Sequence, residues 1–436
     1  MERRLHKLLR ISLLPAVIVL PLCVMLLPPR QPGSGFWWDT AIALGFSATG
    51  LLLVMFVLSA RSRFISRPFG IDLIYYFHRQ LSFVIIALVL AHPLILILLE
   101  PLLTAYLKPD GPFAMQAGLA ALIGLLLLVA AALLHRYLRY EIWRRSHALP
   151  AVFCMFAVLV HILGVNYYVA PLWKKSLILG VFAGWAILLI VVRLIHPWRL
   201  SKQPWQLIDI TAERGRAWTL TLVPQHTVPF QFQAGQFAWL TIRASPFAMC
   251  EHPFSIASAA TETGQLRFTI KELGDCTRQL KTLPMGETFY VDGPYGAFCA
   301  EHFPAADAFV FIVGGIGIVP VMSMLRTLQA KQDRRPVTLF YGAHSLDMLT
   351  FYEELTAMAS DINLTLHFVL QVPPTGRQGE SGCITPTLLA DNLPPVSAQT
   401  EYFICGPPPM MKLVESGLRQ QGIHYAQIHA EIFNLL

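Results

Sequence analysis

Hydrophobic positions are distributed unevenly along the chain, and this distribution predicts a membrane half followed by a soluble half. Six apolar segments are long enough to cross a hydrocarbon core of about 30 Å. They lie at residues 11–28, 38–58, 72–99, 113–134, 147–168 and 176–195. After Pro197 the apolar positions become short alternating runs that are broken by Gly and Pro, a pattern typical of a water-soluble β-structure.

The soluble half contains two successive patterns. Short alternating runs at 218–222 and 236–242 predict a small antiparallel β-barrel. Further along, strands expected at 309–313, 337–341, 364–369 and 402–405 alternate with helical segments, which implies a parallel sheet with helices on both faces. We therefore expect a multidomain membrane protein with a six-helix transmembrane bundle at 1–200, a β-barrel domain at 201–303 and a Rossmann-like α/β domain at 304–436.

The distribution of charged residues predicts how the chain is oriented in the membrane. Among its 436 residues are 33 Lys and Arg and 26 Asp and Glu, which gives a net charge of +7. Binding to nucleic acid is not expected, because the basic residues gather at the ends of the apolar segments. They concentrate before the first segment, at 61–67, at 136–145 and after the sixth, so the positive-inside rule places both termini in the cytoplasm. No small-residue cleavage site follows the basic N-terminus, so the first segment is interpreted as an uncleaved span.

Four histidines lie within two of the apolar segments. His78 and His92 are fourteen residues apart, and so are His147 and His161. Fourteen residues make nearly four helical turns, so each pair projects from one helix face with about 21 Å between its members. A lone histidine in an apolar helix is usually a structural polar contact, but two matched pairs indicate ligands. Imidazole is an axial ligand of haem iron. The segments run in the same direction, so His78 with His147 and His92 with His161 predict an inner and an outer b-type haem.

A first candidate cofactor site lies in the predicted barrel. The run His252-Pro253-Phe254-Ser255 stands on a predicted strand, where a hydroxyl and exposed amides suit the edge of a flavin ring. A plain edge strand that contains a proline is the structural alternative. Further along, Lys271, Gly274 and Thr277 offer a cation, backbone amides and a hydroxyl to a diphosphate. For Lys271 the alternative is an exposed strand lysine.

A second candidate site lies at the ends of two strands of the α/β domain. The first of these strands is followed by a glycine-rich turn and a helix start with Gly314, Gly315, Gly317 and Pro320. Glycines allow close approach of a pyrophosphate, although a glycine turn alone is weak evidence. Cys405, Gly406 and Pro407 end a later strand of the same sheet, at the edge where ligands bind. Cys405 is either a buried core thiol or a neighbour of a nicotinamide.

These motifs resemble known families. The soluble half is similar to the ferredoxin–NADP reductase superfamily, and with the four-histidine membrane half the whole chain resembles the ferric reductase and NADPH oxidase family. The resemblance implies a flavocytochrome of the bacterial inner membrane. Such a protein takes electrons from cytoplasmic NADPH (or NADH) and passes them through FAD and two b-type haems to an extracytoplasmic acceptor.

The resemblance also implies roles for single residues. Ser255 would hydrogen-bond the flavin ring beside His252, Pro253 and Phe254, and Lys271, Gly274 and Thr277 would hold the FAD diphosphate. The glycine turn with Pro320 would bind the pyridine nucleotide, with Cys405, Gly406 and Pro407 near the nicotinamide. Phe433 is the candidate for an aromatic ring stacked on the flavin, with Glu431 nearby. Ser255, Cys405 and Phe433 are accordingly the expected catalytic residues.

Two departures from the family pattern concern the nucleotide. Many relatives carry arginines at the positions of His344 and Cys383, where they suit a 2′-phosphate, so a preference for NADPH over NADH rests on the family alone. The acceptor is also open. Oxygen giving superoxide, a ferric chelate and a periplasmic partner protein all fit, while a non-redox haem-binding membrane protein would leave the flavin and nucleotide motifs without a role. The outer loops carry no cluster of metal ligands, which disfavours a dedicated iron site.

Overall fold

A computed structural model of the chain describes residues 27, 35–60, 71–134, 137, 140–226, 230–376 and 379–432. The chain divides into two compact units, one that ends at Pro197 and one that begins at Trp198. The first expected membrane segment, 11–28, lies outside the described residues apart from Leu27.

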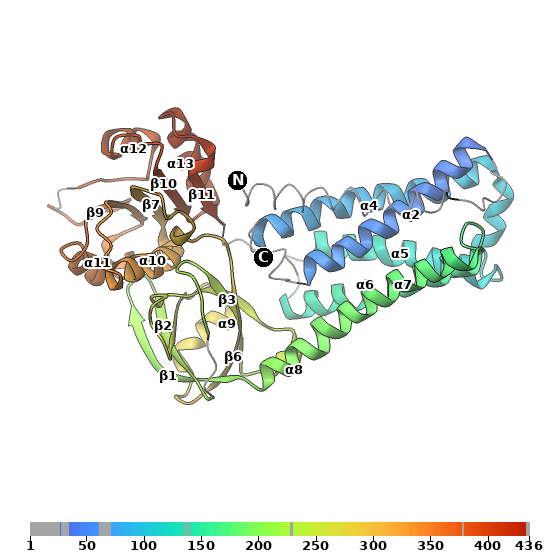
Figure 1. Ribbon diagram of the computed structural model, residues 1–436, viewed down its shortest axis with the longest axis horizontal. Helices are drawn as coiled ribbons and strands as arrows, with labels where there is room; N and C mark the ends of the chain where they lie inside the picture. The colour runs from blue at the N-terminus through green and yellow to red at the C-terminus, as the bar shows by residue number, and fades with distance from the viewer. Residues whose placement is uncertain are drawn as a thin grey trace. The chain divides into compact units, whose positions relative to one another are not determined.

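Long apolar helices build the first unit and run alongside one another (Figure 1). The helices are α2 (Phe36–Ser59), α4 (Ile71–Leu99), α5 (Phe113–Leu133), α6 (Tyr140–Val165) and α7 (Leu172–Ile190), which continues through a π-helical turn (Val191–Ile195) into α8 (His196–Ser201). Within the described residues, five helical stretches are long and apolar enough to cross a membrane. They correspond to the second to sixth expected segments. A short 3₁₀ helix, η1 (Pro101–Leu107), joins α4 to the loop before α5.

The fifth expected segment is displaced from the helix that the structure contains. The sequence pattern predicted 147–168, whereas α6 begins at Tyr140 and ends at Val165. The earlier start includes the basic Arg144 and Arg145, because the backbone of a helix continues past the point at which its side chains become polar. Hydropathy therefore locates the apolar part of a membrane helix and not its ends.

The second unit begins with a curled antiparallel sheet, as the alternating runs predicted. Its strands are β1 (Pro204–Glu213), β2 (Ala217–Pro224), β3 (Phe237–Ile242), β4 (His252–Ser255), β5 (Leu266–Lys271) and β6 (Thr288–Tyr295), in the order β4-β3-β6-β1-β2-β5. A bridge between Ile256 and Phe268 links the two ends of this order, so the sheet curls around one core. Leu220, Phe268 and Phe289 are fully buried in that core.

A five-stranded parallel sheet follows. Its strands are β7 (Ala308–Gly314), β8 (Val337–Ala343), β9 (Leu364–Leu370), β10 (Thr400–Cys405) and β11 (Ile428–Glu431), in the order β11-β10-β7-β8-β9. Helices α10 (Ile318–Ala330) and α11 (Tyr352–Met358) pack in one core, and α12 (Pro386–Asn392) and α13 (Pro408–Gln420) in another, so both faces are covered. Strand β11 was not expected, because four residues are too few for a recognisable alternation.

Helix α10 connects the barrel to the parallel sheet. The Ser323 hydroxyl donates to the carbonyl of Ser258 at 2.7 Å, and the Thr327 hydroxyl accepts from the amide of Ala260 at 2.8 Å. Arg326 donates to the carbonyl of Ala257 at 2.6 Å. All three contacts reach the stretch that directly follows β4. The helix that begins at the glycine turn is therefore attached to the segment that follows the predicted flavin strand.

Candidate functional site

The outer histidines face each other across the first unit. His92 on α4 and His161 on α6 have ring centres 6.4 Å apart, with their planes inclined by 81°. Nδ1 of His92 lies 2.8 Å from the carbonyl oxygen of Ala41, and Nδ1 of His161 lies 2.9 Å from that of Ala114. A carbonyl oxygen only accepts, so each Nδ1 carries the proton and each Nε2 keeps its lone pair for another ligand.

The inner histidines form a matching pair. His78 and His147 have ring centres 6.3 Å apart, with planes inclined by 60°. Nδ1 of His147 is buried and has no hydrogen-bond partner among the described residues, and its ring stacks on Trp143 at 5.9 Å. The structure thus pairs the histidines by level, as the fourteen-residue spacing predicted. Their role as ligands stays a prediction.

The spacing within each pair fits one metal ion between two imidazoles. Metal–imidazole bonds of about 2 Å place two ring centres about 6 Å apart when the nitrogens bind opposite sides of the ion. Both observed separations agree with this value. No group of three or more His, Cys, Asp or Glu side chains in the described parts of the chain is placed to hold a metal ion. A group that supplies its own equatorial ligands, such as haem, therefore suits the pairs.

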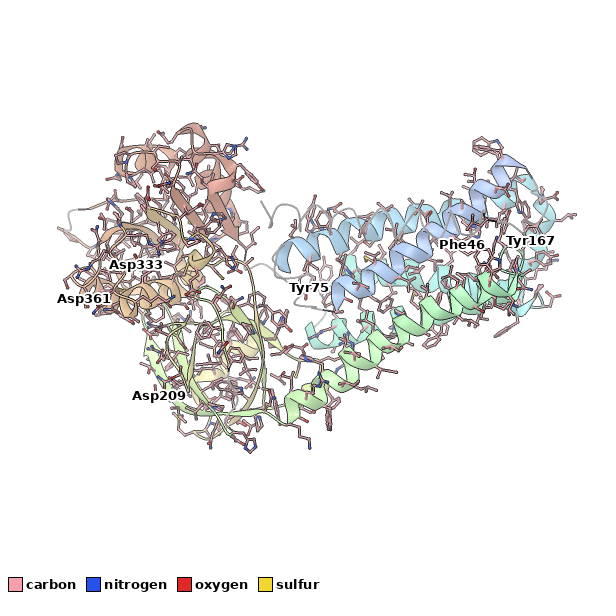
Figure 2. The ribbon with its side chains drawn as sticks, in the orientation of Figure 1. Phe46, Tyr75, Tyr167, Asp209, Asp333 and Asp361 are labelled. Atoms are coloured by element: carbon pink, nitrogen blue, oxygen red, sulfur yellow. The ribbon has the colours of Figure 1, made fainter. Side chains whose placement is uncertain are left out.

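A cavity of about 360 Å³ adjoins the outer pair. His92 and His161 line it together with mainly apolar side chains from α2, α4, α5 and α6. Phe46 and Tyr167 also line it, and both lie toward the same end of the bundle, far from Tyr75 (Figure 2). Its volume is within the range of about 300–1,000 Å³ found for small-molecule sites. The outer site therefore combines paired imidazoles with an apolar chamber.

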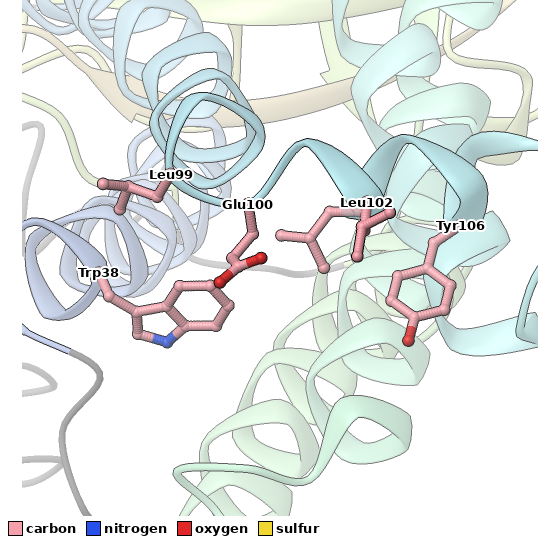
Figure 3. A pocket seen from close by; sticks show the side chains of 6 residues that line it. Trp38, Leu99, Glu100, Leu102 and Tyr106 are labelled. Atoms are coloured by element: carbon pink, nitrogen blue, oxygen red, sulfur yellow. The ribbon is translucent and has the colours of Figure 1, made fainter.

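Figure 3 shows the side chains that line a second cavity. The volume of this cavity is about 510 Å³. It is lined by Trp38, Leu99, Glu100, Leu102, Leu103 and Tyr106. Trp38, Leu103 and Tyr106 line both cavities. Among the described lining residues Glu100 is the charged one, and η1 forms much of the wall. The outer histidines thus share a wall with a cavity at the α4–η1 end of the helices.

In the second unit, the predicted flavin strand is the edge strand β4. Ser255 pairs with Phe237 on β3, and its side chain is 8% exposed. His252 and Phe254 lie on one face, with ring centres 6.4 Å apart, and Pro253 lies between them opposite Trp239. A proline is accommodated here because an edge strand leaves one side of its backbone unpaired.

The predicted diphosphate residues lie around the end of β5. Lys271 is the last residue of that strand and pairs with Ala217. The Thr277 hydroxyl accepts from the amides of Leu273 and Gly274, both at 2.9 Å, and donates to the carbonyl of Gly274. Thr277 therefore orders the turn before α9 (Asp275–Arg278), and these two amides are already bonded within the turn. Sequence reasoning expected open amides at this place. The diphosphate role of the three residues stays a prediction.

The glycine turn and the Cys405 turn lie against each other at the carboxyl ends of β7 and β10. A Cβ on Gly317 would be 2.3 Å from the carbonyl oxygen of Cys405, and a Cβ on Gly406 would be 2.9 Å from the amide nitrogen of Gly314. Gly315 has a φ of +55°. Side chains would separate the two backbones, so glycine is required at the contact. Pro320 is buried in the first turn of α10, and Pro407 precedes α13.

Cys405 is connected to the barrel through its strand partner Glu431. It is fully buried and pairs with Glu431 on β11, and this burial, together with the Glu431 carboxylate, raises the pKa of its thiol well above the usual range. A Cβ on Gly296 would lie 3.2 Å from the ring of Phe237 and 3.6 Å from Oε1 of Glu431. Phe237 is the strand partner of Ser255. Ser255 and Cys405 thus border one region, while Phe433 lies outside the described residues.

The two positions that lack arginine are brought together by the fold. His344 follows β8, and its Nδ1 is 3.0 Å from Oε1 of Gln371, which follows β9. The amide of Gln371 donates to the sulfur of Cys383 at 3.6 Å. These three side chains therefore form one hydrogen-bonded group, without a guanidinium, at the carboxyl edge of the sheet. Gln371 was missed by the sequence reasoning because only the fold places it between the other two.

Comparisons with known proteins agree with this arrangement. Family descriptions match three parts of the chain: "Ferric reductase like transmembrane component" at residues 44–158, "FAD-binding domain" at 218–298 and "Oxidoreductase NAD-binding domain" at 311–416. The chain is 34% identical over 173 residues to NADH-cytochrome b5 reductase 1 of Debaryomyces hansenii, covering 38% of this chain and 60% of the relative. It is 28% identical to the glycine betaine monooxygenase reductase subunit of Pseudomonas aeruginosa, covering 54% and 65%.

In both curated relatives the match spans less than two thirds of their length. Among solved structures, a flavohemoglobin from Malassezia yamatoensis with bound FAD and heme has a TM-score of 0.50 and 20% identity, covering 91% of this chain and 97% of that one. This likeness concerns the fold alone. The chain therefore has the architecture of the ferric reductase and NADPH oxidase family, in which a ferric reductase-like transmembrane component is followed by an FAD-binding and an NAD-binding domain.

Proposed function

We propose that the chain is a transmembrane oxidoreductase that passes electrons from NAD(P)H through FAD and two b-type haems to an acceptor across the membrane. The observation that carries this function is the pair of facing imidazole pairs, at 6.3 and 6.4 Å, on the same two helices. They occur in one chain with an FAD-binding and an NAD-binding domain. Two carriers are needed because one could not bridge a core of about 30 Å.

The residues of the chain hold and orient the cofactors. Haem, when bound, supplies a one-electron carrier. His78 with His147 and His92 with His161 hold the two haems, and the Nδ1 hydrogen bonds of His92 and His161 fix which ring nitrogen faces the iron. In the second unit, Ser255 donates to the flavin. Cys405 remains a neutral thiol that packs beside the nicotinamide, because its raised pKa disfavours a thiolate.

Charge distribution supports an orientation. The basic residues at 61–67, at 136–145 and after the last membrane helix support a cytoplasmic position of both termini, the FAD domain and the NAD domain. The bacterial inner membrane is the proposed location. The outer cavities then open toward the extracytoplasmic side, where the acceptor is reduced.

Oxygen, giving superoxide, is the acceptor that we propose. The charged side chain that lines the outer cavity is Glu100, whose carboxylate repels an anionic ferric chelate but not a small neutral molecule. The described residues of the outer loops also lack a cluster of metal ligands. A ferric chelate and a periplasmic protein acceptor are the alternatives.

The test is the NAD(P)H-driven reduction of cytochrome c by the purified, FAD-supplemented protein, with and without superoxide dismutase. Oxygen as the acceptor requires that the dismutase abolish the cytochrome c signal. A signal that persists with the dismutase, or that requires an added ferric chelate, overturns the oxygen assignment and supports one of the alternatives.

A further inference from the structure

Each outer histidine lies against a glycine of a neighbouring helix. His92 donates to Ala41 on α2 and packs against Gly45, while His161 donates to Ala114 on α5 and packs against Gly118. In both cases the glycine follows the accepting carbonyl by four residues. In an α-helix the carbonyl of residue i accepts from the amide of residue i+4. Each histidine therefore donates to the same alanine carbonyl oxygen that accepts the backbone amide of the glycine it packs against.

The distances favour glycine at both positions, more strongly at Gly118 than at Gly45. A Cβ on Gly118 would lie 2.6 Å from Nδ1 and 2.9 Å from Cε1 of His161. A Cβ on Gly45 would lie 3.2 Å from Nδ1 and 3.3 Å from Cε1 of His92. The first contact is an overlap, and the second is tighter than ordinary packing. A side chain at either position therefore pushes the ring away from its carbonyl, more at Gly118 than at Gly45.

A third glycine supports the arrangement around His161. Gly164 lies one helical turn after His161 on α6, and its Cβ would be 2.5 Å from the Cβ of Ala114. Gly118 on α5 and Gly164 on α6 thus face each other's helices around the same hydrogen bond. Small residues allow two membrane helices to approach closely. This approach brings the Ala114 carbonyl within 2.9 Å of the histidine.

We propose that Gly45 and Gly118 are positioning residues for the outer haem. Their lack of a side chain lets His92 and His161 donate to backbone carbonyls, and these hydrogen bonds orient both Nε2 atoms toward one iron. This role rests on the proposed haem ligation. A hydrogen bond from Nδ1–H to a carbonyl also makes the imidazole more basic, which favours ferric over ferrous iron. Loss of the hydrogen bond therefore raises the midpoint potential of the outer haem.

The effect is confined to one level of the bundle. Among the described glycines other than Gly50 and Gly379, Gly45 and Gly118 are the two whose nearest contacts are histidine ring atoms, and both contact the outer pair. The inner haem, held by His78 and His147, consequently serves as an internal reference in the same molecule. A change in both haems indicates general damage to the bundle and not the loss of one histidine's hydrogen bond.

The experiment compares full-length Gly118→Ala and Gly45→Ala with two glycine controls. Gly180→Ala on α7 adds a Cβ that meets nothing within 4 Å. Gly124→Ala on α5 adds a Cβ 2.5 Å from the sulfur of Cys154, which is comparable crowding without a histidine. Haem per protein is measured as the pyridine haemochrome, midpoint potentials by spectroscopic redox titration, and ligand orientation by low-spin EPR. NADH-driven ferricyanide reduction reports that the FAD and NAD domains are folded.

In Gly118→Ala we expect the outer haem to bind about 10–100-fold more weakly, as for other losses of a ligand's hydrogen-bond partner. Where this haem is retained, its midpoint rises and its EPR signal changes, while the inner haem is unaffected. Gly45→Ala shows a smaller change in the same direction and provides the test if Gly118→Ala does not fold. Gly180→Ala and Gly124→Ala keep the outer haem signals of the wild type.

Wild-type midpoints and EPR signals in Gly45→Ala, or in a folded Gly118→Ala, overturn the positioning role and leave the haem assignment standing. An equal loss of the outer haem in Gly124→Ala also overturns it, because crowding alone then explains the effect. Absence of haem from the wild-type protein refutes the proposed function instead.

Discussion

At the scale of single residues, the histidines of the two facing pairs have unlike surroundings. His92 and His161 are fixed by hydrogen bonds to backbone carbonyls, whereas His147 is held by stacking on Trp143. The sequence predicted which histidines pair, because helical periodicity depends on spacing alone. It did not predict Gly45 and Gly118, since a glycine in an apolar helix has the same pattern whether it faces lipid or a ring.

Replacing His92 or His161 by leucine tests the outer ligands. Leucine fills the space without a ligand nitrogen, so we expect loss of the outer haem absorbance and a fall in acceptor reduction to background. Reduction of FAD by NAD(P)H remains, because the second unit contains its own domains for both. The measurement is the haem spectrum together with stopped-flow flavin reduction. Retention of both haems with full acceptor reduction would exclude these residues as ligands.

The group His344, Gln371 and Cys383 predicts nucleotide preference. None of these three side chains offers a guanidinium to a 2′-phosphate, so NADH should be used at least as well as NADPH. Cys383→Arg adds a guanidinium, and a hydrogen bond to a charged group contributes about 1.5–3 kcal/mol. We expect the KM for NADPH to fall about tenfold or more, with the KM for NADH little changed.

Steady-state kinetics of flavin-linked ferricyanide reduction check this expectation, with Cys383→Ser as the matched control. An unchanged ratio of the two KM values in Cys383→Arg would show that the 2′ position of the nucleotide is read elsewhere in the chain.

At the scale of elements, the short strand β11 was not predicted from the sequence. It supplies Glu431 beside Cys405, and it supplies His429, whose Nε2 is 2.7 Å from Oε2 of Glu401 on β10. His429 also lies against Phe303, with ring centres 4.2 Å apart. Strands β7, β8, β9 and β10 were predictable because each is rich in apolar residues. The attachment of α10 to the barrel was not, because it depends on hydrogen bonds between residues more than sixty positions apart.

The neighbouring strand β10 makes stability depend on pH through Glu401. Burial raises the pKa of Glu401 from 4.5 to about 7. The folded state therefore keeps the proton between these values while the unfolded chain releases it, so this contribution is fully present below pH 4.5 and is lost as pH rises through 7. We expect the midpoint of thermal FAD release to fall across this range in the wild type and to fall less in Glu401→Gln.

In a unit of this size, each kcal/mol changes the midpoint by about 2–4 °C. Flavin fluorescence during heating at a series of pH values gives the comparison directly. Parallel curves for the wild type and Glu401→Gln would show that Glu401 does not titrate in this range.

At the scale of the whole molecule, the chain joins a nucleotide site, a flavin site and two histidine pairs in a fixed order along the sequence. Hydropathy and periodicity predicted the order of the membrane, barrel and α/β parts. The cofactor sites were assigned from motifs and from the family resemblance, and stay predictions. The acceptor was not predictable from sequence, since an outer cavity is formed by side chains from loops and helices that only folding brings together. Its lining, with Glu100 as the charged member, is visible only in three dimensions.

The most direct test of the account is anaerobic addition of NADH to the purified, FAD-supplemented protein while its haem absorbance is recorded. The account predicts that bis-histidine haem co-purifies and that NADH reduces it to the extent reached with dithionite. Haem that dithionite reduces but NADH does not, although the flavin is reduced, would contradict electron transfer from flavin to haem. Absence of haem would contradict the assignment of the four histidines as haem ligands.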